Sequence, residues 1–208
     1  MKYVDEFMSK FRVDGRLEYE TRLIDVQLYN DTETGYAEIR QGRTHVRTQL
    51  DSTTERSKFK MNLKYLQADS VTERQKYQIK SKIEKIFSDI MRSSGTSVTV
   101  LVVEDNGGLI AAIINCITLC LTHCSVPIAD MAIAVSYNTG IDLCKKEENG
   151  PFIALLVYLS NTKKVIYFDA AGSFTRTSFI ECTEAAKLAC QNIASQFKTT
   201  LLTSNDSR

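Results

Sequence analysis

Several features are missing from this 208-residue sequence, and each absence excludes a class of protein. No apolar run is long enough to cross a bilayer, because a transmembrane helix needs about 20 residues and the longest run covers only Leu109 to Leu121. No secretory signal is expected, since Met1 to Lys10 is charged and short. No low-complexity segment or long linker divides the chain. The sequence therefore predicts one globular domain over residues 1–208 and no association with a membrane.

The six cysteines include no Cys-x-x-Cys pair, and most of them lie in apolar helical runs. This pattern favours buried, reduced thiols in a cytosolic or nuclear protein. Cys116, Cys120, His123 and Cys124 share one helical stripe, which raises the alternative of a zinc site. One helix cannot surround a metal with four tetrahedral ligands, and no second ligand cluster is evident. We therefore expect core thiols, with no metal and no cofactor.

Net charge is nearly absent, at +1, but it is unevenly distributed. Residues 55–92 contain ten lysines or arginines against five acids, so this segment carries +5 and the remainder about −4. A local basic face is therefore possible on a protein that is not basic as a whole.

The first part of the chain has the pattern of a β-meander. Polar and apolar residues alternate with a period of two, most clearly from Phe59 to Gln67, and turn residues separate the runs. The predicted strands are Arg22–Tyr29, Gly35–Arg40, Thr44–Leu50 and Phe59–Gln67.

A helix is predicted next, because Ser70 and Glu73 have the spacing of a capping box. Its apolar face recurs at helical intervals, and Gly95 supplies a stop. The apolar stripe is Ile79, Ile83, Ile86, Phe87, Ile90 and Met91, and the opposite face carries Arg74, Lys82 and Lys85.

The second half predicts a strand, a helix that Pro127 terminates, three strands and a final helix. The strands are Val98–Val103, Met131–Tyr137, Phe152–Leu159 and Val165–Ala170, and the helices are Gly107–His123 and Ser178–Leu201. The stripe expected to pack in the last helix is Ile180, Ala186, Ala189, Ile193, Phe197 and Leu201. This order of elements indicates an α+β fold in which helices pack against mixed or largely antiparallel sheets.

The turn Gly107-Gly108-Leu109-Ile110 lies between a strand and a long apolar helix. A glycine pair before a helix N-terminus makes a plausible anion cradle, since the first backbone N–H groups point toward the turn. A site that binds phosphate normally adds a cationic or hydroxyl side chain there, where this chain has leucine and isoleucine. The turn is therefore either a degenerate phosphate site or a plain strand-to-helix turn.

Taken in order, these motifs resemble the ribonuclease PH family over nearly the whole chain. The matching residues are Arg12, Asp14, Gly15, Arg16, Glu20 and Arg22; Gly35-Tyr36-Ala37; Gly42-Arg43-Thr44-His45-Val46; Asp105-Asn106-Gly107-Gly108; Ala112 to Leu119; and Val126-Pro127-Ile128. The resemblance implies a ribonuclease PH-like fold (also described as ribosomal protein S5 domain 2-like), with mixed sheets packed against helices.

Within that family, Asp142-Leu143 followed by Glu147-Glu148 and Gly150-Pro151 looks most like a ring subunit of the eukaryotic RNA exosome, the counterpart of the archaeal catalytic chain. Such chains form a six-membered ring of ribonuclease PH-like subunits around an RNA channel. The resemblance also implies cap subunits, a separate hydrolytic ribonuclease, and a location in nucleus, nucleolus and cytoplasm. The ring mainly guides RNA for 3′→5′ degradation and processing.

Loss of phosphorolysis is predicted from the same comparison. Active members place a hydroxyl and an arginine directly after the glycine pair, where this chain has Leu109 and Ile110. Their carboxylate pair, six residues apart, corresponds to Asp142 and Glu148, which we interpret as vestigial. Two alternatives stay open: an active phosphate-dependent 3′→5′ exoribonuclease that uses Asp142 and Glu148, and a structural protein that never meets RNA.

Five basic residues are candidate RNA contacts, because cations in a loop or on a helix face hold phosphates without reading sequence. Arg56 and Lys58 fall between two predicted strands, and Arg74, Lys76 and Lys80 fall in the first turns of the predicted helix. The alternative for each is an ordinary solvated surface.

A last group of charged residues, Arg12, Asp14, Arg16 and Arg22, could suggest a catalytic cluster, but we interpret it as structural. We expect its arginines to pair with acids and to fix the N-terminal segment or a ring contact.

Overall fold

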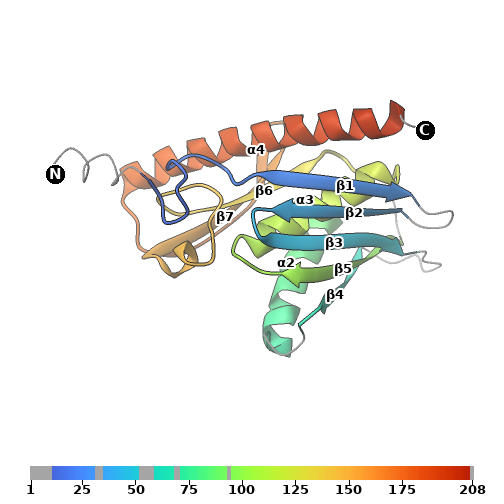
Figure 1. Ribbon diagram of the computed structural model, residues 1–208, viewed down its shortest axis with the longest axis horizontal. Helices are drawn as coiled ribbons and strands as arrows, with labels where there is room; N and C mark the ends of the chain where they lie inside the picture. The colour runs from blue at the N-terminus through green and yellow to red at the C-terminus, as the bar shows by residue number, and fades with distance from the viewer. Residues whose placement is uncertain (1–10, 31–34, 52–58, 68–70, 93–94, 207–208) are drawn as a thin grey trace.

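Two β-sheets enclose a central helix in the computed structural model, which describes residues 11–30, 35–51, 59–67, 71–92 and 95–206. A five-stranded sheet packs against one side of α3 (Leu109–His123) and a three-stranded sheet against the other. Helix α4 (Arg176–Asp206) lies along the top of the molecule and packs on the second sheet (Figure 1). The predicted α+β class and the order of the elements are confirmed.

The five-stranded sheet has the order β1-β2-β3-β5-β4. Its strands are β1 (Ile24–Asn30), β2 (Gly35–Gln41), β3 (Thr44–Asp51), β4 (Lys60–Tyr65) and β5 (Ser97–Glu104). The meander prediction holds for β1 to β3, which pair antiparallel in sequence order. It is wrong for β4, because β5 inserts between β3 and β4 and runs parallel to β4. The long connection through a helix makes this parallel pairing possible.

Helix α2 (Glu73–Ile90) covers the end of this sheet near β4. Its N-cap is Thr72, which forms a reciprocal capping box with Gln75, and not the predicted pair of Ser70 and Glu73. Ser70 lies outside the described residues, and Glu73 instead pairs with Lys76. The predicted apolar face is confirmed, since Ile83, Ile86, Phe87 and Ile90 are buried, with Ile79 and Met91 packed against the core.

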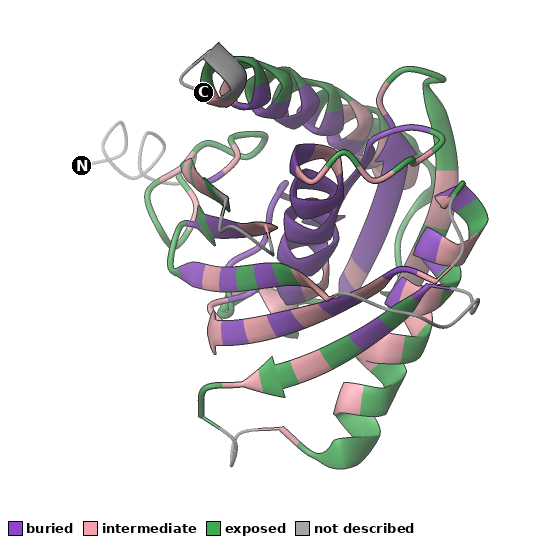
Figure 2. Ribbon diagram, turned by 90° about the vertical axis from the view of Figure 1, so that its right-hand side faces the viewer, coloured by how far each residue is buried: buried purple, intermediate pink, exposed green. Residues whose placement is uncertain are grey.

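Helix α3 is buried on nearly every side (Figure 2), as expected for an apolar helix between two sheets. Its few polar groups bond to the neighbouring strands, as Asn115 does with both the N–H and the carbonyl of Ala134. The predicted core thiols lie here, where Cys116 donates to the carbonyl of Ala37 and burial raises its pKa to about 12. A thiol with that pKa is an inert packing group.

The second sheet has the order β6-β7-β8, with β6 (Ala132–Tyr137), β7 (Phe152–Leu159) and β8 (Lys164–Gly172) pairing antiparallel. Helix α4 packs on it through most of the predicted stripe, but Ile180 is 51% exposed. Ile180 comes six residues before Ala186, which places it about 120° around the helix. Cys182, Cys190 and Ala194 are buried in addition. No helix of the described chain has the length and hydrophobicity needed to cross a membrane.

Candidate functional site

The glycine pair lies where β5 ends and α3 begins, and its backbone conformation requires glycine. Gly107 and Gly108 have φ values of 92° and 64°. A side chain at Gly107 would collide with the backbone of Cys144 and Lys145. Thr44 fixes the turn, because its hydroxyl donates to Gly107 O at 2.7 Å and accepts from Asn106 N–H at 3.1 Å. The turn is therefore rigid and packed closely on the segment that carries Glu148.

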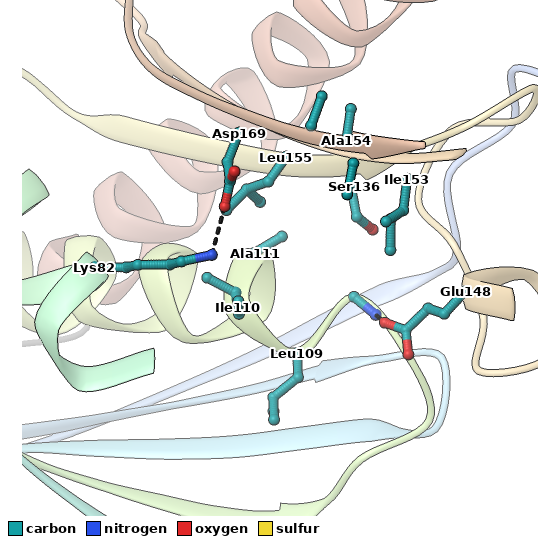
Figure 3. Close-up of a pocket in the computed structure, with 13 residues that line it drawn as sticks. Lys82, Leu109, Ile110, Ala111, Ser136, Glu148, Ile153, Ala154, Leu155 and Asp169 are labelled. Carbon is teal, nitrogen blue, oxygen red and sulfur yellow. Dashed lines mark hydrogen bonds and ion pairs between the residues drawn. The ribbon is translucent and has the colours of Figure 1, made fainter. Parts of the chain in front are cut away.

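The cradle at the start of α3 contains the carboxylate of Glu148. Glu148 belongs to the short helix η2 (Glu147–Asn149), and its Oε1 accepts the Gly108 N–H at 2.9 Å (Figure 3). Its Oε2 lies 3.2 Å from Lys145 Nζ, which also bonds to Asp105 at 2.8 Å. A negative charge at a helix N-terminus is favourable. The protein thus supplies its own anion at the place where an external phosphate would bind.

Burial disfavours the charged form of Lys145, but the carboxylates of Asp105 and Glu148 outweigh it and raise its pKa above the usual value. Lys145 therefore stays protonated and holds the Glu148 carboxylate beside the Gly108 N–H. The sequence analysis did not single out Lys145 or Asp105. The spacing of Lys145 three residues before Glu148 is the only local signal of this contact.

A cavity of about 230 Å³ adjoins the cradle (Figure 3). Its walls are mainly apolar and come from α3, β7 and β8: Leu109, Ile110, Ala111, Ile153, Ala154, Leu155, Ala170 and Ala171. Leucine and isoleucine at 109 and 110 thus present hydrocarbon where a phosphate would need donors. The cavity is poorly suited to an anion.

Lys82, which the sequence predicts on the helix face opposite the apolar stripe, has a side chain that is 41% exposed. It lines the cavity and donates to Asp169 of β8 at 2.5 Å, joining α2 to the second sheet (Figure 3). The hydrogen bond to Asp169 raises the pKa of Lys82. Sequence periodicity missed this contact because Asp169 lies 87 residues further along the chain.

Asp142 is buried, with 1% of its surface exposed, and is fully engaged by Arg22. Its Oδ2 accepts the backbone N–H and the Nε of Arg22 at 2.8 and 3.1 Å, and its Oδ1 accepts Nη2 at 2.6 Å. Arg22 also donates to the carbonyls of Asn106 and Gly107, so it links Asp142 to the glycine turn. A carboxylate in this position anchors the fold and has no free oxygen directed to solvent.

The other arginines near the N-terminus pair with acids, as predicted. Arg12 binds Glu147 through two nitrogens at 2.5 and 2.7 Å, and Arg16 binds Asp14 at 2.6 and 2.9 Å. These pairs occupy Asp14 and Glu147, which lie with Cys144 in the one cluster of metal-ligand types among the described residues. Because both carboxylates bind guanidinium groups, the cluster does not fit a metal ion.

Three of the five RNA candidates lie in the described structure. Arg56 and Lys58 lie outside the described residues. Lys76 pairs with Glu73 at 2.7 Å and lies over the Tyr65 ring, and Lys80 lies 3.8 Å from Glu84. Arg74 is exposed and has no hydrogen-bond or ion-pair partner in the described part of the chain.

Most of the chain superposes on solved structures of exosome components. It matches rice (Oryza sativa) Rrp46 with a TM-score of 0.78, covering 92% of this chain and 100% of that one, at 20% identity. The chain has the fold of an exosome core subunit. The predicted ribonuclease PH-like fold is therefore confirmed.

Two archaeal structures show the same fold at 14% identity and a TM-score of 0.70. An archaeal exosome core matches over 95% of both chains, and an Archaeoglobus fulgidus exosome with RNA bound to its active site matches over 94% of this chain and 96% of that one. No protein-family model and no curated protein matches the sequence. At such low identities the comparison establishes the fold alone.

Proposed function

We propose that this chain is a non-catalytic ring subunit of an RNA exosome core, helping to form the channel that guides RNA for 3′→5′ degradation and processing. The observation that carries the proposal is the end-to-end match to rice Rrp46, over 92% of this chain and all of that one. The partners would be other ribonuclease PH-like chains in a six-membered ring, with cap subunits, a separate hydrolytic ribonuclease and RNA. Nucleus, nucleolus and cytoplasm are the proposed locations.

The non-catalytic part of the proposal rests on the site. Phosphorolysis needs a phosphate held beside the scissile linkage and a free carboxylate for metal or acid work. Here the cradle N–H binds Glu148, the following positions are Leu109 and Ile110, and Asp142 is taken up by Arg22. Both requirements fail, and the phosphate site fails in two separate ways, so no single side-chain rearrangement restores them.

Purified protein incubated with 3′-extended labelled RNA, Mg²⁺ and inorganic phosphate is expected to release no nucleoside diphosphate. An active phosphorolytic exosome, run in parallel, gives the signal expected of a working site. Release of nucleoside diphosphates that stops in the Asp142→Asn and Glu148→Gln variants, while circular dichroism shows both variants folded, would establish the alternative, an exoribonuclease that uses these two carboxylates.

Mass spectrometry of material that co-purifies with the tagged protein tests the ring. We expect other chains of the same fold in stoichiometric amounts, eluting as one complex in size-exclusion chromatography. A stable monomer without such partners would contradict the proposal. In the assembled complex, RNA crosslinks at Arg74 are expected from an RNA guide, and their absence would favour a purely structural ring subunit.

A further inference from the structure

The five-stranded sheet has one face that the described chain leaves uncovered. Helix α3 packs on the other face through β2, β3 and β5, and Figure 1 looks onto the open one. Buried residues alternate with intermediate or exposed ones along β3 and β5 (Figure 2), so every second side chain points outward. Ala37, Ile39, Val46 and Val100 face the core, while Tyr36, Glu38, Arg47 and Leu101 face outward.

An aromatic ladder crosses three strands of this open face. Tyr29 of β1 lies directly opposite Tyr36 of β2, and their rings stack with centroids 4.6 Å apart at 20°. The guanidinium of Arg47, on β3, lies 5.3 Å from the centroid of the Tyr36 ring. Tyr29 ends the ladder and is 40% exposed. The ladder therefore presents a flat, partly exposed ring that is held in place from one side.

A buried carboxylate organises the cations beside the ladder. Glu38 has a side chain 4% exposed, and it accepts two hydrogen bonds from Arg47, one from Arg40 at 3.3 Å and one contact from His45 at 2.6 Å. Burial raises the pKa of Glu38, but hydrogen bonds from Arg47 and His45 outweigh it and lower the pKa below the usual value. One negative charge thus orients two guanidinium groups that remain about half exposed, at 54% and 47%.

The cluster keeps a positive charge after this pairing, because Arg40 and Arg47 share one carboxylate. Lys64 of β4 adds a third cation on this face. Lys64 and Arg47 are paired with Leu101 of β5 from its two sides. Three further acids lie on the same face: Asp25 is opposite Arg40, and Glu104 is opposite His45 and lies 3.3 Å from Arg43. Asp51 is the third, and it accepts from the hydroxyls of Ser97 and Thr99. Asp51 and Glu104 are engaged by these partners, and Arg40 and Arg47 keep about half of their side chains exposed beside the ladder.

We propose that this open face binds single-stranded RNA, with Arg40 and Arg47 on successive phosphates and a base stacked on Tyr29. Oriented arginines next to an exposed aromatic ring are the combination that holds single strands without reading their sequence. An unpaired strand is required, because the base of a duplex has no free plane to stack on the ring. The site lies apart from the glycine turn and from Arg74, and it depends on neither ring assembly nor phosphorolysis.

Fluorescence anisotropy of a labelled oligouridylate with the isolated full chain tests the charges. The double variant Arg40→Ala/Arg47→Ala is expected to bind about tenfold more weakly at low salt, and the slope of log affinity against log salt should fall by about 1.4, for two lost phosphate contacts. The matched control is Lys187→Ala/Lys198→Ala on α4, which removes the same charge from another surface and should reduce binding little. Circular dichroism verifies that both variants are folded.

Tyr29→Leu tests the stacking separately and leaves all charges in place. We expect binding about fivefold weaker or more, with an unchanged salt slope. Crosslinks from 4-thiouridine RNA should map to β1 and β2, which supports the assignment even if the arginine double variant fails to fold. Wild-type protein without measurable RNA affinity, crosslinks confined to other surfaces, or equal losses in the arginine and lysine double variants would each overturn it. If crosslinks lie on other surfaces, or if the two double variants lose equal affinity, the arginines around Glu38 would instead serve to contact another protein.

Discussion

Replacing Asp142 with asparagine is expected to lower the free energy of unfolding by about 3–5 kcal/mol. The Asp142 carboxylate is almost completely buried and accepts three hydrogen bonds from Arg22, which is itself buried. Asparagine keeps the shape of the side chain, and it tolerates the positive φ of 58° at this position better than most residues. The loss therefore isolates the charge, because the guanidinium of Arg22 is left in the interior without its counter-ion.

Urea denaturation followed by far-UV circular dichroism measures this loss. Asp14→Asn is the control, since Asp14 also pairs with an arginine but has a side chain 30% exposed. A pair that reaches solvent contributes about 0–1 kcal/mol, so the control should change stability little. In Arg22→Met/Asp142→Asn the two losses should not add, because the second change removes the unpaired charge that the first leaves. A loss below about 1 kcal/mol for Asp142→Asn would make Asp142 a candidate for chemistry again.

Asp142 and Glu148 thus have structural partners in this chain, although their spacing suits a pair of reactive carboxylates. Asp142 ties the N-terminal segment to the glycine turn through Arg22, and Glu148 closes the start of α3. Each oxygen that would bind a metal or a proton instead accepts a hydrogen bond or pairs with a cation. Each of the two carboxylates therefore has a structural use in this chain.

Local patterns predicted most of the fold. The apolar stripe of α2 and the period-two alternation of the strands depend only on neighbours a few residues away, and both were found correctly. The parallel pairing of β4 with β5 was missed, because strand order depends on contacts across a whole helix. The absence of phosphate donors at Leu109 and Ile110 was readable from sequence, since it concerns residue identity.

The contact between Glu148 and Gly108 could not be predicted, because 40 residues separate the two and no periodicity connects them. The same holds for Lys82 and Asp169, which meet across the cavity from α2 and β8. In each case a charged residue that appears solvated in its own element finds its partner through tertiary packing. The sequence therefore indicated that positions 109 and 110 lack phosphate donors, and the structure adds that the Glu148 carboxylate accepts the Gly108 N–H.

Glu148→Ala is expected to turn the closed cradle into an anion site. The substitution leaves the Gly108 N–H and the Lys145 ammonium without their common carboxylate, and both point to the same small volume. Phosphate at about ten times its dissociation constant would then stabilise the variant by about 1.4 kcal/mol. For a chain of this size that corresponds to a rise in Tm of about 3–6 °C. The wild-type protein should show no rise, because Glu148 competes from within the molecule at a high effective concentration.

Thermal melts in phosphate and in chloride of equal ionic strength measure the difference. Glu104→Ala is the matched control, since it removes the same charge from an exposed pair with Arg43. Adding Leu109→Ser and Ile110→Arg to the Glu148→Ala background should strengthen phosphate binding further, because a guanidinium binds phosphate through two hydrogen bonds. A wild-type protein that phosphate stabilises as much as the variant would mean that the cradle is already open. If phosphate does not stabilise the Glu148→Ala variant, the Glu148 carboxylate only caps α3. The lack of side-chain donors at positions 109 and 110 would then be enough to prevent phosphate from binding.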